Sequence, residues 1–230
     1  MRLPRAAVVL VALLATLGLG GGTAYAAAWS SSEKFATWSD NGYLVRNNIW
    51  GSGVGPQTIW ANSYSSWGVW ADHPDTGGVK SYPHSARPID ERISEIDTLT
   101  SEFDVSVPEG GAYATSYDIW VDDHGYEIML WMNQHGPVGP IGSRVDTTEV
   151  GGHTWDVHRG SNGYNEVFSF VRHGDTNAAT VDIKAVLDWI VQQGWFSAEE
   201  SVHEVQFGFE ITSSSGGMDF VSNRYSVTSE

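Results

Sequence analysis

Three acidic residues, Asp118, Glu127 and Glu210, lie in stretches whose alternating pattern predicts β-strands, each on the less apolar side of its strand. Side chains alternate across a strand. Glu127 therefore shares a side with Met129, Trp131 and Asn133, and the core-forming side carries Ile128, Leu130 and Met132. A carboxylate in line with a thioether, an indole and an amide is typical of a groove that holds a sugar ring. The alternative is an ordinary exposed glutamate on a surface strand.

The other two acids show the same arrangement. Asp118 shares a side with Ala114, Ser116 and Trp120, and Glu210 shares one with Glu204, Gln206 and Gly208. The opposite side of the second strand is apolar, with Val205, Phe207, Phe209 and Ile211. Gly208 is expected to leave space beside Glu210, because glycine has no side chain. If the three polar sides belong to one concave sheet, the acids converge.

Two converging carboxyl groups can cleave a glycosidic bond. One attacks the sugar or activates water, and the other protonates the departing oxygen. A like charge nearby raises the pKa of one partner, which then stays protonated near neutral pH. A third acid can share a proton with the nucleophile and position it. An acidic β-protein contains many carboxylates, however, so the pattern alone leaves a structural interpretation open.

The surrounding sequence predicts an all-β sandwich or barrel. Short β-prone runs recur between turns rich in Gly, Asn, Asp, Ser and Pro, and the turn Asn41-Gly42 precedes the first of them. The predicted strands are residues 43–50, 57–64, 67–72, 113–121, 125–133, 154–159, 164–172, 202–212 and 219–227. Helical spacing predicts one long helix over 181–193, with Thr180 as N-cap and Gly194 as its stop, packed outside the sandwich.

The first residues predict a secretory signal peptide. Arg2 and Arg5 precede an apolar run over 6–19, and Ala24-Tyr25-Ala26 supplies the small-residue cleavage pattern. We expect a leader over residues 1–28, cleaved near Ala26 to Ala28, and one catalytic domain over 29–230. The product would be a secreted monomer without a membrane anchor.

Composition excludes several other functions. Loss of the two leader arginines changes the formal charge from −16 to −18, which disfavours nucleic acid as a partner. The chain has no cysteine, so thiol catalysis and cysteine metal sites are excluded. The histidines show no metal-ligand spacing, Gly51 to Gly55 opens no helix, and no Gly-x-Ser-x-Gly is present. We expect neither a metal nor an organic cofactor.

The sequence resembles glycoside hydrolase family 12 in an ordered set of motifs that covers almost all of the mature chain. The motifs are Asn41-Gly42-Tyr43, Asn47-Asn48-Ile49-Trp50-Gly51, Val79-Lys80-Ser81-Tyr82, Tyr117-Asp118-Ile119-Trp120, Glu127-Ile128-Met129-Leu130-Trp131, Gly139-Pro140-Ile141-Gly142 and Gln206-Phe207-Gly208-Phe209-Glu210. No single motif is very specific, but their order is.

The resemblance implies a β-jelly-roll of two antiparallel sheets with an open cleft, and retaining hydrolysis of internal β-1,4-glucosidic bonds. By resemblance, Glu127 is the nucleophile, Glu210 the acid/base and Asp118 the acid that positions the nucleophile. Asn48 and Trp50 would contact sugars, and Met129, Trp131 and Pro140 would line the cleft. A retaining mechanism implies carboxyl groups about 5–5.5 Å apart.

The sequence departs from the family in places. It lacks the N-terminal disulfide of many members, and where an N-terminal cleft tryptophan is expected it has Phe35, with Trp38 nearby. Asn162, in a Ser-Asn-Gly turn, is interpreted as a turn residue, with a sugar contact as the alternative. The substrate would be a β-glucan polysaccharide. The rival interpretations are a xyloglucan-specific endo-β-1,4-glucanase and a non-catalytic jelly-roll carbohydrate-binding protein.

Overall fold

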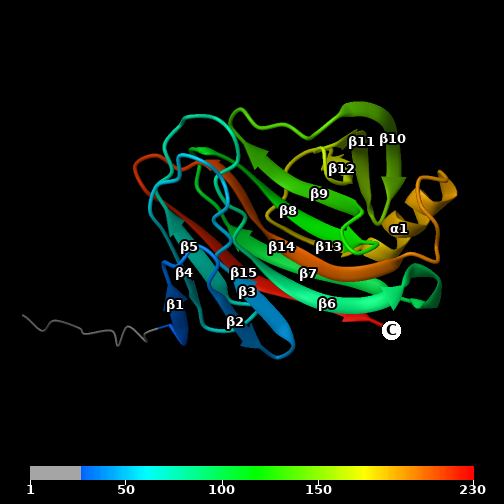
Figure 1. The fold of residues 1–230 in the computed structure, drawn as a ribbon, viewed down its shortest axis with the longest axis horizontal. Helices are drawn as coiled ribbons and strands as arrows, with labels where there is room; N and C mark the ends of the chain where they lie inside the picture. The colour runs from blue at the N-terminus through cyan, green and yellow to red at the C-terminus, as the bar shows by residue number, and fades with distance from the viewer. Residues whose placement is uncertain (1–26) are drawn as a thin grey trace, which may run out of the picture.

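Two β-sheets pack face to face in the computed structural model, which describes residues 27–230 (Figure 1). The predicted leader lies outside the described residues, apart from Ala27 and Ala28. The smaller sheet has the strand order β1 (Trp29–Ser31), β4 (Gln57–Ala61), β5 (Trp67–Ala71), β15 (Met218–Ser229), β7 (Leu99–Ser106) and β13 (Ala178–Asp182). Among the described residues, no helix is long and apolar enough to cross a membrane.

The larger sheet carries most of the strands with chemically interesting residues. Its order is β10 (Ser143–Val150), β11 (His153–Ser161), β12 (Glu166–Arg172), β9 (Tyr126–His135), β8 (Ala112–Val121), β14 (Ser201–Ser213), β6 (His84–Arg92), β3 (Tyr43–Arg46) and β2 (Thr37–Asp40). All neighbours are antiparallel except β9 and β12, which run parallel. The predicted all-β sandwich is confirmed, with this one parallel pair inside it.

The core lies between the sheets and is built by strict alternation. On β9, Ile128, Leu130 and Met132 are fully buried in it, as predicted from their spacing. On β14 the same holds for Val205, Phe207, Phe209 and Ile211. Each such side chain contributes about 1.5–3 kcal/mol when it leaves water. This burial fixes the register of both strands, because a slip by one residue would turn their core faces toward solvent.

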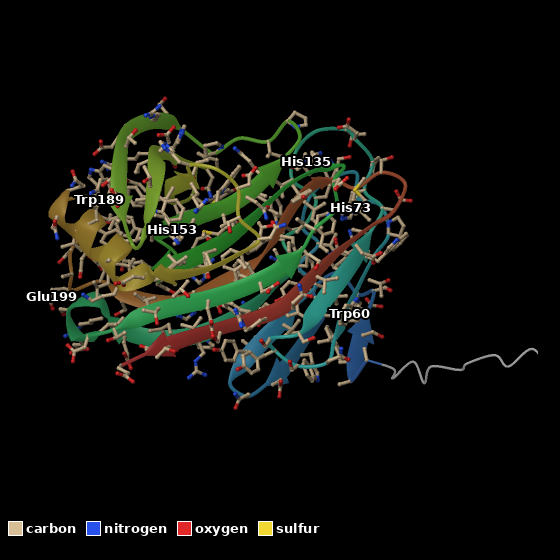
Figure 2. The ribbon with its side chains drawn as sticks, turned by 180° about the vertical axis from the view of Figure 1, so that it is seen from behind. Trp60, His73, His135, His153, Trp189 and Glu199 are labelled. Carbon is tan, nitrogen blue, oxygen red and sulfur yellow. The ribbon has the colours of Figure 1, made fainter. Side chains whose placement is uncertain are left out.

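The helix α1 (Ile183–Gln192) begins later than predicted. Thr180 and Val181 belong to β13, where they pair with Glu102 and Ser101 of β7. The N-cap is therefore Asp182, whose carboxylate accepts a hydrogen bond from Ala185 N at 3.0 Å. The expected Thr180 cap is wrong because sheet pairing continues through that residue. Trp189 of α1 and Trp60 of β4 lie at opposite ends of the molecule (Figure 2).

Some strands were not expected from the sequence. These are β1, β2, β6, β7, β10 and β13. The strand β6 contains Pro88 and several charged residues, and Pro88 lies at an irregularity in its pairing with β14. The 3-10 helix η1 (Ile93–Glu95) follows it. In β7 the signal was present, because Leu99, Ser101, Phe103 and Val105 alternate as buried residues.

The first predicted strand ends earlier than expected. The predicted turn at Asn41 and Gly42 is present, with φ values of 50° and 80°, and it closes a hairpin in which Asp40 of the unexpected strand β2 pairs with Tyr43. The strand β3 then stops at Arg46 instead of continuing to Trp50. Asn48 has a left-handed φ of 41°, which bends the chain out of the sheet. This bend brings residues 48–50 to the outer face of the larger sheet.

Candidate active site

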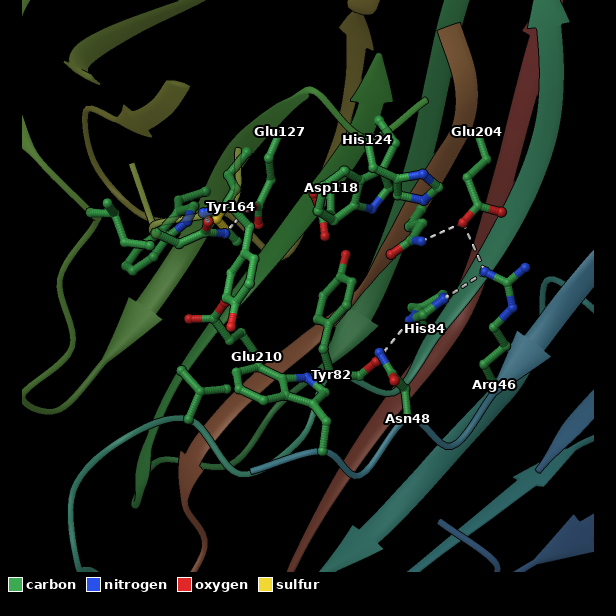
Figure 3. A pocket seen from close by; sticks show the side chains of 18 of the residues that line it. Arg46, Asn48, Tyr82, His84, Asp118, His124, Glu127, Tyr164, Glu204 and Glu210 are labelled. Atoms are coloured by element: carbon green, nitrogen blue, oxygen red, sulfur yellow. Dashed lines mark hydrogen bonds and ion pairs between the residues drawn. The ribbon is translucent and has the colours of Figure 1, made fainter. Parts of the chain in front are cut away.

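A pocket of about 650 Å³ opens on the outer face of the larger sheet. Its floor consists of side chains from β3, β6, β8, β9 and β14, at the positions that alternate with core residues. Loops after β3, β9 and β11 form its rim. Asp118, Glu127 and Glu210 all line it, and their carboxyl groups point into the same part of the pocket (Figure 3). The structure therefore brings together the three acids that alternation alone had suggested.

The three acids come from three adjacent strands in the middle of the sheet. Glu127 on β9 pairs with Trp120 of β8, and Asp118 on β8 lies opposite Met129 of β9. Glu210 on β14 pairs with Ala114 of β8. Because Ala114 has a small side chain, it does not fill the space between the strands above the sheet.

The environment favours the protonated form of all three carboxyl groups. Burial raises the pKa of Glu210 to about 7, with a further contribution from the charge of Glu127. Burial and the charges of Glu127 and Glu210 hold the pKa of Asp118 well above its usual range. Burial also raises the pKa of Glu127, although a hydrogen bond from Asn165 opposes the rise. Such a cluster retains protons near neutral pH and can both give and accept them.

Asp118 is nearly inaccessible to solvent. Its side chain is 6% exposed, and its Oδ1 has no hydrogen-bond partner among residues 27–230. The Tyr82 hydroxyl, which donates to Ser116 O at 3.0 Å, lines the same pocket. The charges of Asp118 and Glu210 add to burial in raising the pKa of Tyr82 well above its usual value. Tyr82 is thus a neutral donor close to two acids, a role that the sequence analysis did not assign to it.

Gly208 has a different role from the one expected. A side chain at this position would meet the Pro83 carbonyl oxygen at 2.1 Å and the His84 Cα at 2.7 Å. The space beside this residue is therefore filled by the backbone of the neighbouring segment. Glycine is required here because the segment at Pro83 and His84 approaches closely, and not to leave room for a ligand.

Two asparagines hold one oxygen of Glu127. Asn165 Nδ2 donates to Glu127 Oε2 at 3.0 Å, and Asn162 Nδ2 donates to the same oxygen at 3.3 Å. Asn162 also closes its own turn, because its Oδ1 accepts from the backbone nitrogens of Tyr164 and Asn165. The turn interpretation of Asn162 thus describes half of its role. Sequence reasoning missed Asn165, although the repeated Asn around Gly163 was a signal.

Asn48 and Trp50 line the pocket on the bend after β3. Trp50 is 54% exposed, so its indole is not a core side chain and is available as a flat surface. A buried amide network holds the bend from behind. Gln57 Nε2 donates to Asn47 O and Oδ1 at 2.9 and 2.8 Å, and Gln57 Oε1 accepts from Ser81 Oγ and lies 2.8 Å from His73 Nε2.

Met129 and Trp131 form a small apolar surface on the pocket floor. They are 5% and 3% exposed and pack with Ala114 and Val167 in a cluster separate from the main core. Both line the pocket, whereas Pro140 does not: its neighbours Gly139 and Ile141 are in the lining instead.

The pocket-facing side predicted for β9 ends at Trp131 and does not continue to Asn133. Asn133 donates to Asn177 Oδ1 at 2.6 Å and is not among the lining residues, because the pairing of β8 and β9 shifts at Thr115 and Ser116.

A charged pair at one wall of the pocket was not anticipated. Arg46 Nη1 donates to Glu204 Oε1 at 2.8 Å, and Gln206 Nε2 donates to the same oxygen. Arg46 also lies beside His84 Nε2 at 3.4 Å (Figure 3). Burial and the Arg46 charge lower the pKa of His84 to about 4, so this histidine is neutral above that pH. The wall therefore presents hydrogen-bonding groups with balanced charge.

The expected tryptophan at the far end of the cleft has no direct replacement. Trp38 stacks on Trp29 with ring centroids 6.2 Å apart and packs against the core. Phe35 is 69% exposed, but neither Phe35 nor Trp38 lines the pocket. A different aromatic ring, that of Tyr164, lines the opposite rim and is 98% exposed.

Comparisons with known proteins give a consistent result. The sequence profile of glycosyl hydrolase family 12 matches residues 41–230. Endoglucanase S of Pectobacterium parmentieri is 32% identical, over 96% of this chain and 95% of that protein. Xyloglucan-specific endo-beta-1,4-glucanase A of Emericella nidulans is 29% identical, over 81% and 85% of the two chains. The xyloglucanase domain of NopAA, a type three effector from Sinorhizobium fredii, in complex with cellobiose, has a TM-score of 0.85 and 42% identity, over 88% of this chain and 99% of that one.

The two-sheet fold, with buried carboxyl groups gathered in one open pocket, defines a glycoside hydrolase of the jelly-roll type. The matches extend over nearly the whole described chain. Within that class, the chain belongs to glycosyl hydrolase family 12.

Proposed function

We propose that the protein is a secreted, retaining endo-β-1,4-glucanase in which Glu127 is the nucleophile and Glu210 the acid/base. The observation that carries the proposal is the placement of these two acids on β9 and β14, facing one pocket and linked electrostatically. In an open pocket of this kind a polysaccharide can bind by an internal stretch of its chain, which suits internal cleavage.

The two steps follow from the protonation states. In the first, the Glu127 carboxylate attacks the anomeric carbon while Glu210 gives its proton to the departing oxygen, and a glycosyl-enzyme forms. In the second, Glu210 removes a proton from water, and the water oxygen replaces Glu127 at the anomeric carbon. Each step leaves Glu210 in the state that the next one needs.

Asp118 would position the nucleophile. Its neutral form is favoured because burial and the charges of Glu127, Glu210 and Glu204 hold its pKa well above the usual range. A protonated carboxyl can donate a hydrogen bond to the Glu127 carboxylate, whereas an ionised one would repel it. The proposal therefore assigns Asp118 a neutral state in the resting enzyme.

The substrate is proposed to be a β-1,4-glucan, with cellulose-type chains and xyloglucan as the two candidates. The names of the relatives support both, because they include an endoglucanase and a xyloglucan-specific enzyme. The polar wall of Arg46 and Glu204 and the exposed rings of Trp50 and Tyr164 offer contacts beyond a single linear chain. A non-catalytic carbohydrate-binding protein would not need two acids with raised pKa values in its pocket.

Substitution of each acid tests the enzymatic proposal. Glu127→Ala and Glu210→Ala should each reduce the release of reducing ends from soluble β-glucan by at least about a thousandfold. Binding of cello-oligosaccharides, measured by calorimetry, should persist in both variants. Glu149→Ala, an exposed acid on β10, is the matched control and should retain full activity.

The same assay on xyloglucan and carboxymethylcellulose ranks the substrates, and NMR of the first product reports whether the anomeric configuration is retained. Full activity of either active-site variant would remove that residue from its assigned role. Absence of hydrolysis by the wild-type protein, with binding intact, would favour the carbohydrate-binding alternative.

A further inference from the structure

The turn between β11 and β12 contacts the Glu127 carboxylate from the side of the parallel strand. Strand β12 runs beside β9 with Val167 in register with Glu127. The turn before β12, residues 162–165, therefore lies next to Glu127, because it leads directly into the strand that pairs with β9. Asn165, at its last position, is 8% exposed and donates to Glu127 Oε2 at 3.0 Å.

The turn does not need the Asn165 side chain for its own shape. Ser161 Oγ donates to Asn165 O and accepts from Gly163 N, and Asn162 Oδ1 accepts the nitrogens of Tyr164 and Asn165. Two of these bonds involve Asn165, at its carbonyl oxygen and its backbone nitrogen, and neither uses its side chain. Within residues 27–230, the hydrogen bond that its amide group makes is the one to Glu127. The side chain is thus held by the turn and directed at the carboxylate.

We propose that Asn165 is a positioning residue for the nucleophile, which holds Oε2 of Glu127 so that Oε1 is directed at the anomeric carbon. This inference rests on the proposed function of Glu127. A carboxylate on a long side chain has several rotamers, and a fixed donor at one oxygen restricts it to one. Productive geometry must be kept to within a fraction of an ångström, so this restriction acts on the rate of attack.

The hydrogen bond also controls ionisation of the nucleophile. Burial raises the pKa of Glu127, and donation by Asn165 lowers it. The bond therefore opposes protonation of the Glu127 carboxylate, whose ionised form attacks the anomeric carbon in the proposed mechanism. Without the amide donor, the pKa of Glu127 rises, and the acidic limb of the rate profile moves to higher pH.

The test is the rate at which Glu127 is covalently labelled. A 2-deoxy-2-fluoro-β-cellobioside with a dinitrophenolate leaving group traps the glycosyl-enzyme, and this leaving group departs without a proton from Glu210. Asn165→Ala should slow labelling by about 10- to 100-fold, because a hydrogen bond to a charged group is lost. The KM for soluble β-glucan should change less than kcat.

A second variant separates positioning from folding. Asn165→Asp keeps the size of the side chain but replaces the donor by an acid, and it should move the acidic limb of kcat/KM further upward than Asn165→Ala. Asn223→Ala is the control. It removes an asparagine on β15, far from the pocket, that donates hydrogen bonds to Asp104 and Ser106. This variant should leave the rate of covalent labelling and the acidic limb of the kcat/KM profile unchanged.

Each outcome is decisive. Unchanged labelling rate and acidic limb in both Asn165 variants, with only a lower melting temperature, would show that Asn165 is a structural residue. Slower labelling with an upward limb supports positioning. If the wild-type protein itself is not labelled at Glu127, the proposed nucleophile fails, and that failure is recognised before any Asn165 variant is compared.

Discussion

At the scale of single residues, the central feature is a group of acids whose surroundings oppose their charge. Glu210 lies in a partly buried site beside Glu127, and both burial and the neighbouring charge favour its neutral form. The site is thereby prepared for proton donation. The same environment weakens the folded state once the proton is lost, so catalysis and stability make opposite demands on this residue.

The pKa of Glu210 predicts the alkaline limit of activity. As the proposed acid/base, Glu210 must carry a proton when substrate binds, so kcat/KM should fall as pH rises through about 7. The acidic limit should lie above the usual carboxyl range because the pKa of Glu127 is raised. Because the carboxyl groups interact, the acidic and alkaline limits of activity are properties of the whole cluster and not of one residue each. Initial rates on soluble β-glucan from pH 4 to 9 measure both, and a flat profile across pH 7 would contradict the assignment.

Glu210→Gln should make the protein more stable in alkaline solution. A raised native pKa means that the folded state retains a proton which the unfolded chain releases near pH 4.5, so stability is lost as pH rises from there through about 7. The substitution removes this loss, which has an upper limit of about 3 kcal/mol. In urea unfolding, the wild-type protein and the Glu210→Gln variant should have equal free energies of unfolding at pH 4.5. At pH 8 the variant should be the more stable of the two. The reverse order would refute the shift.

At the scale of elements, the pocket depends on segments that depart from regular strands. The bend at Asn48 is held by a buried network in which the amide of Gln57, 2% exposed, contacts residues from three segments. Low local polarity strengthens such bonds and makes each unpaired group costly. Trp50 is therefore supported by a polar interior rather than by the apolar core.

Gln57→Ala should loosen this bend. The change removes the Gln57 amide from the buried groups of His73, Ser81 and Asn47 that it contacts, which costs about 2–4 kcal/mol. Thermal unfolding should show the loss, and KM for β-glucan should rise because Trp50 is no longer fixed. Gln134→Ala, an exposed residue on β9, is the control and should change neither quantity. A Gln57→Ala variant with unchanged stability and unchanged KM would show that the bend at Asn48 does not need the Gln57 network.

The sequence predicts these elements unevenly, for physical reasons. The alternation of apolar and polar residues identifies β8, β9 and β14 and the faces that carry their acids, because one face of each strand is buried in the core. The strand β6 is not predictable in this way, since its proline and charged residues belong to the sheet through their pairing with β14, a distant segment of the sequence. Arg46 and Glu204 are far apart in sequence, and only the order of β3, β6 and β14 brings them to one wall. Asn165 is missed because turns have no alternation.

At the scale of the whole molecule, the chain has a large core, no cysteine and a strongly negative charge. The two sheets bury enough apolar surface to be stable without disulfides. The order of strands explains how this is achieved, because β9, β8 and β14 lie in the interior of the larger sheet and each pairs on both edges. The acids are thus carried by the strands that are held most firmly.

The predicted export of the protein can be tested by expressing residues 1–230. When residues 1–230 are expressed in a secreting host, the protein in the medium should begin between Ala27 and Trp29, because the predicted leader ends in a small-residue cleavage pattern. Intact mass and N-terminal sequencing measure this directly. Replacement of the apolar run over 6–19 by polar residues should leave the protein inside the cell. A secreted protein that still begins at Met1 would contradict the cleavage prediction.

The position of β14 has a consequence for the time at which the enzyme becomes active. This strand lies between β8 and β6, yet it is the next-to-last strand to be synthesised. A ribosome must release more than nine-tenths of the chain before Glu210 can join Asp118 and Glu127. Until then the larger sheet has a gap at its centre, and any shortened product that ends before residue 201 lacks Glu210, the proposed acid/base. The gathering of the three acids therefore waits for the synthesis of β14, long after β8 and β9 have been made.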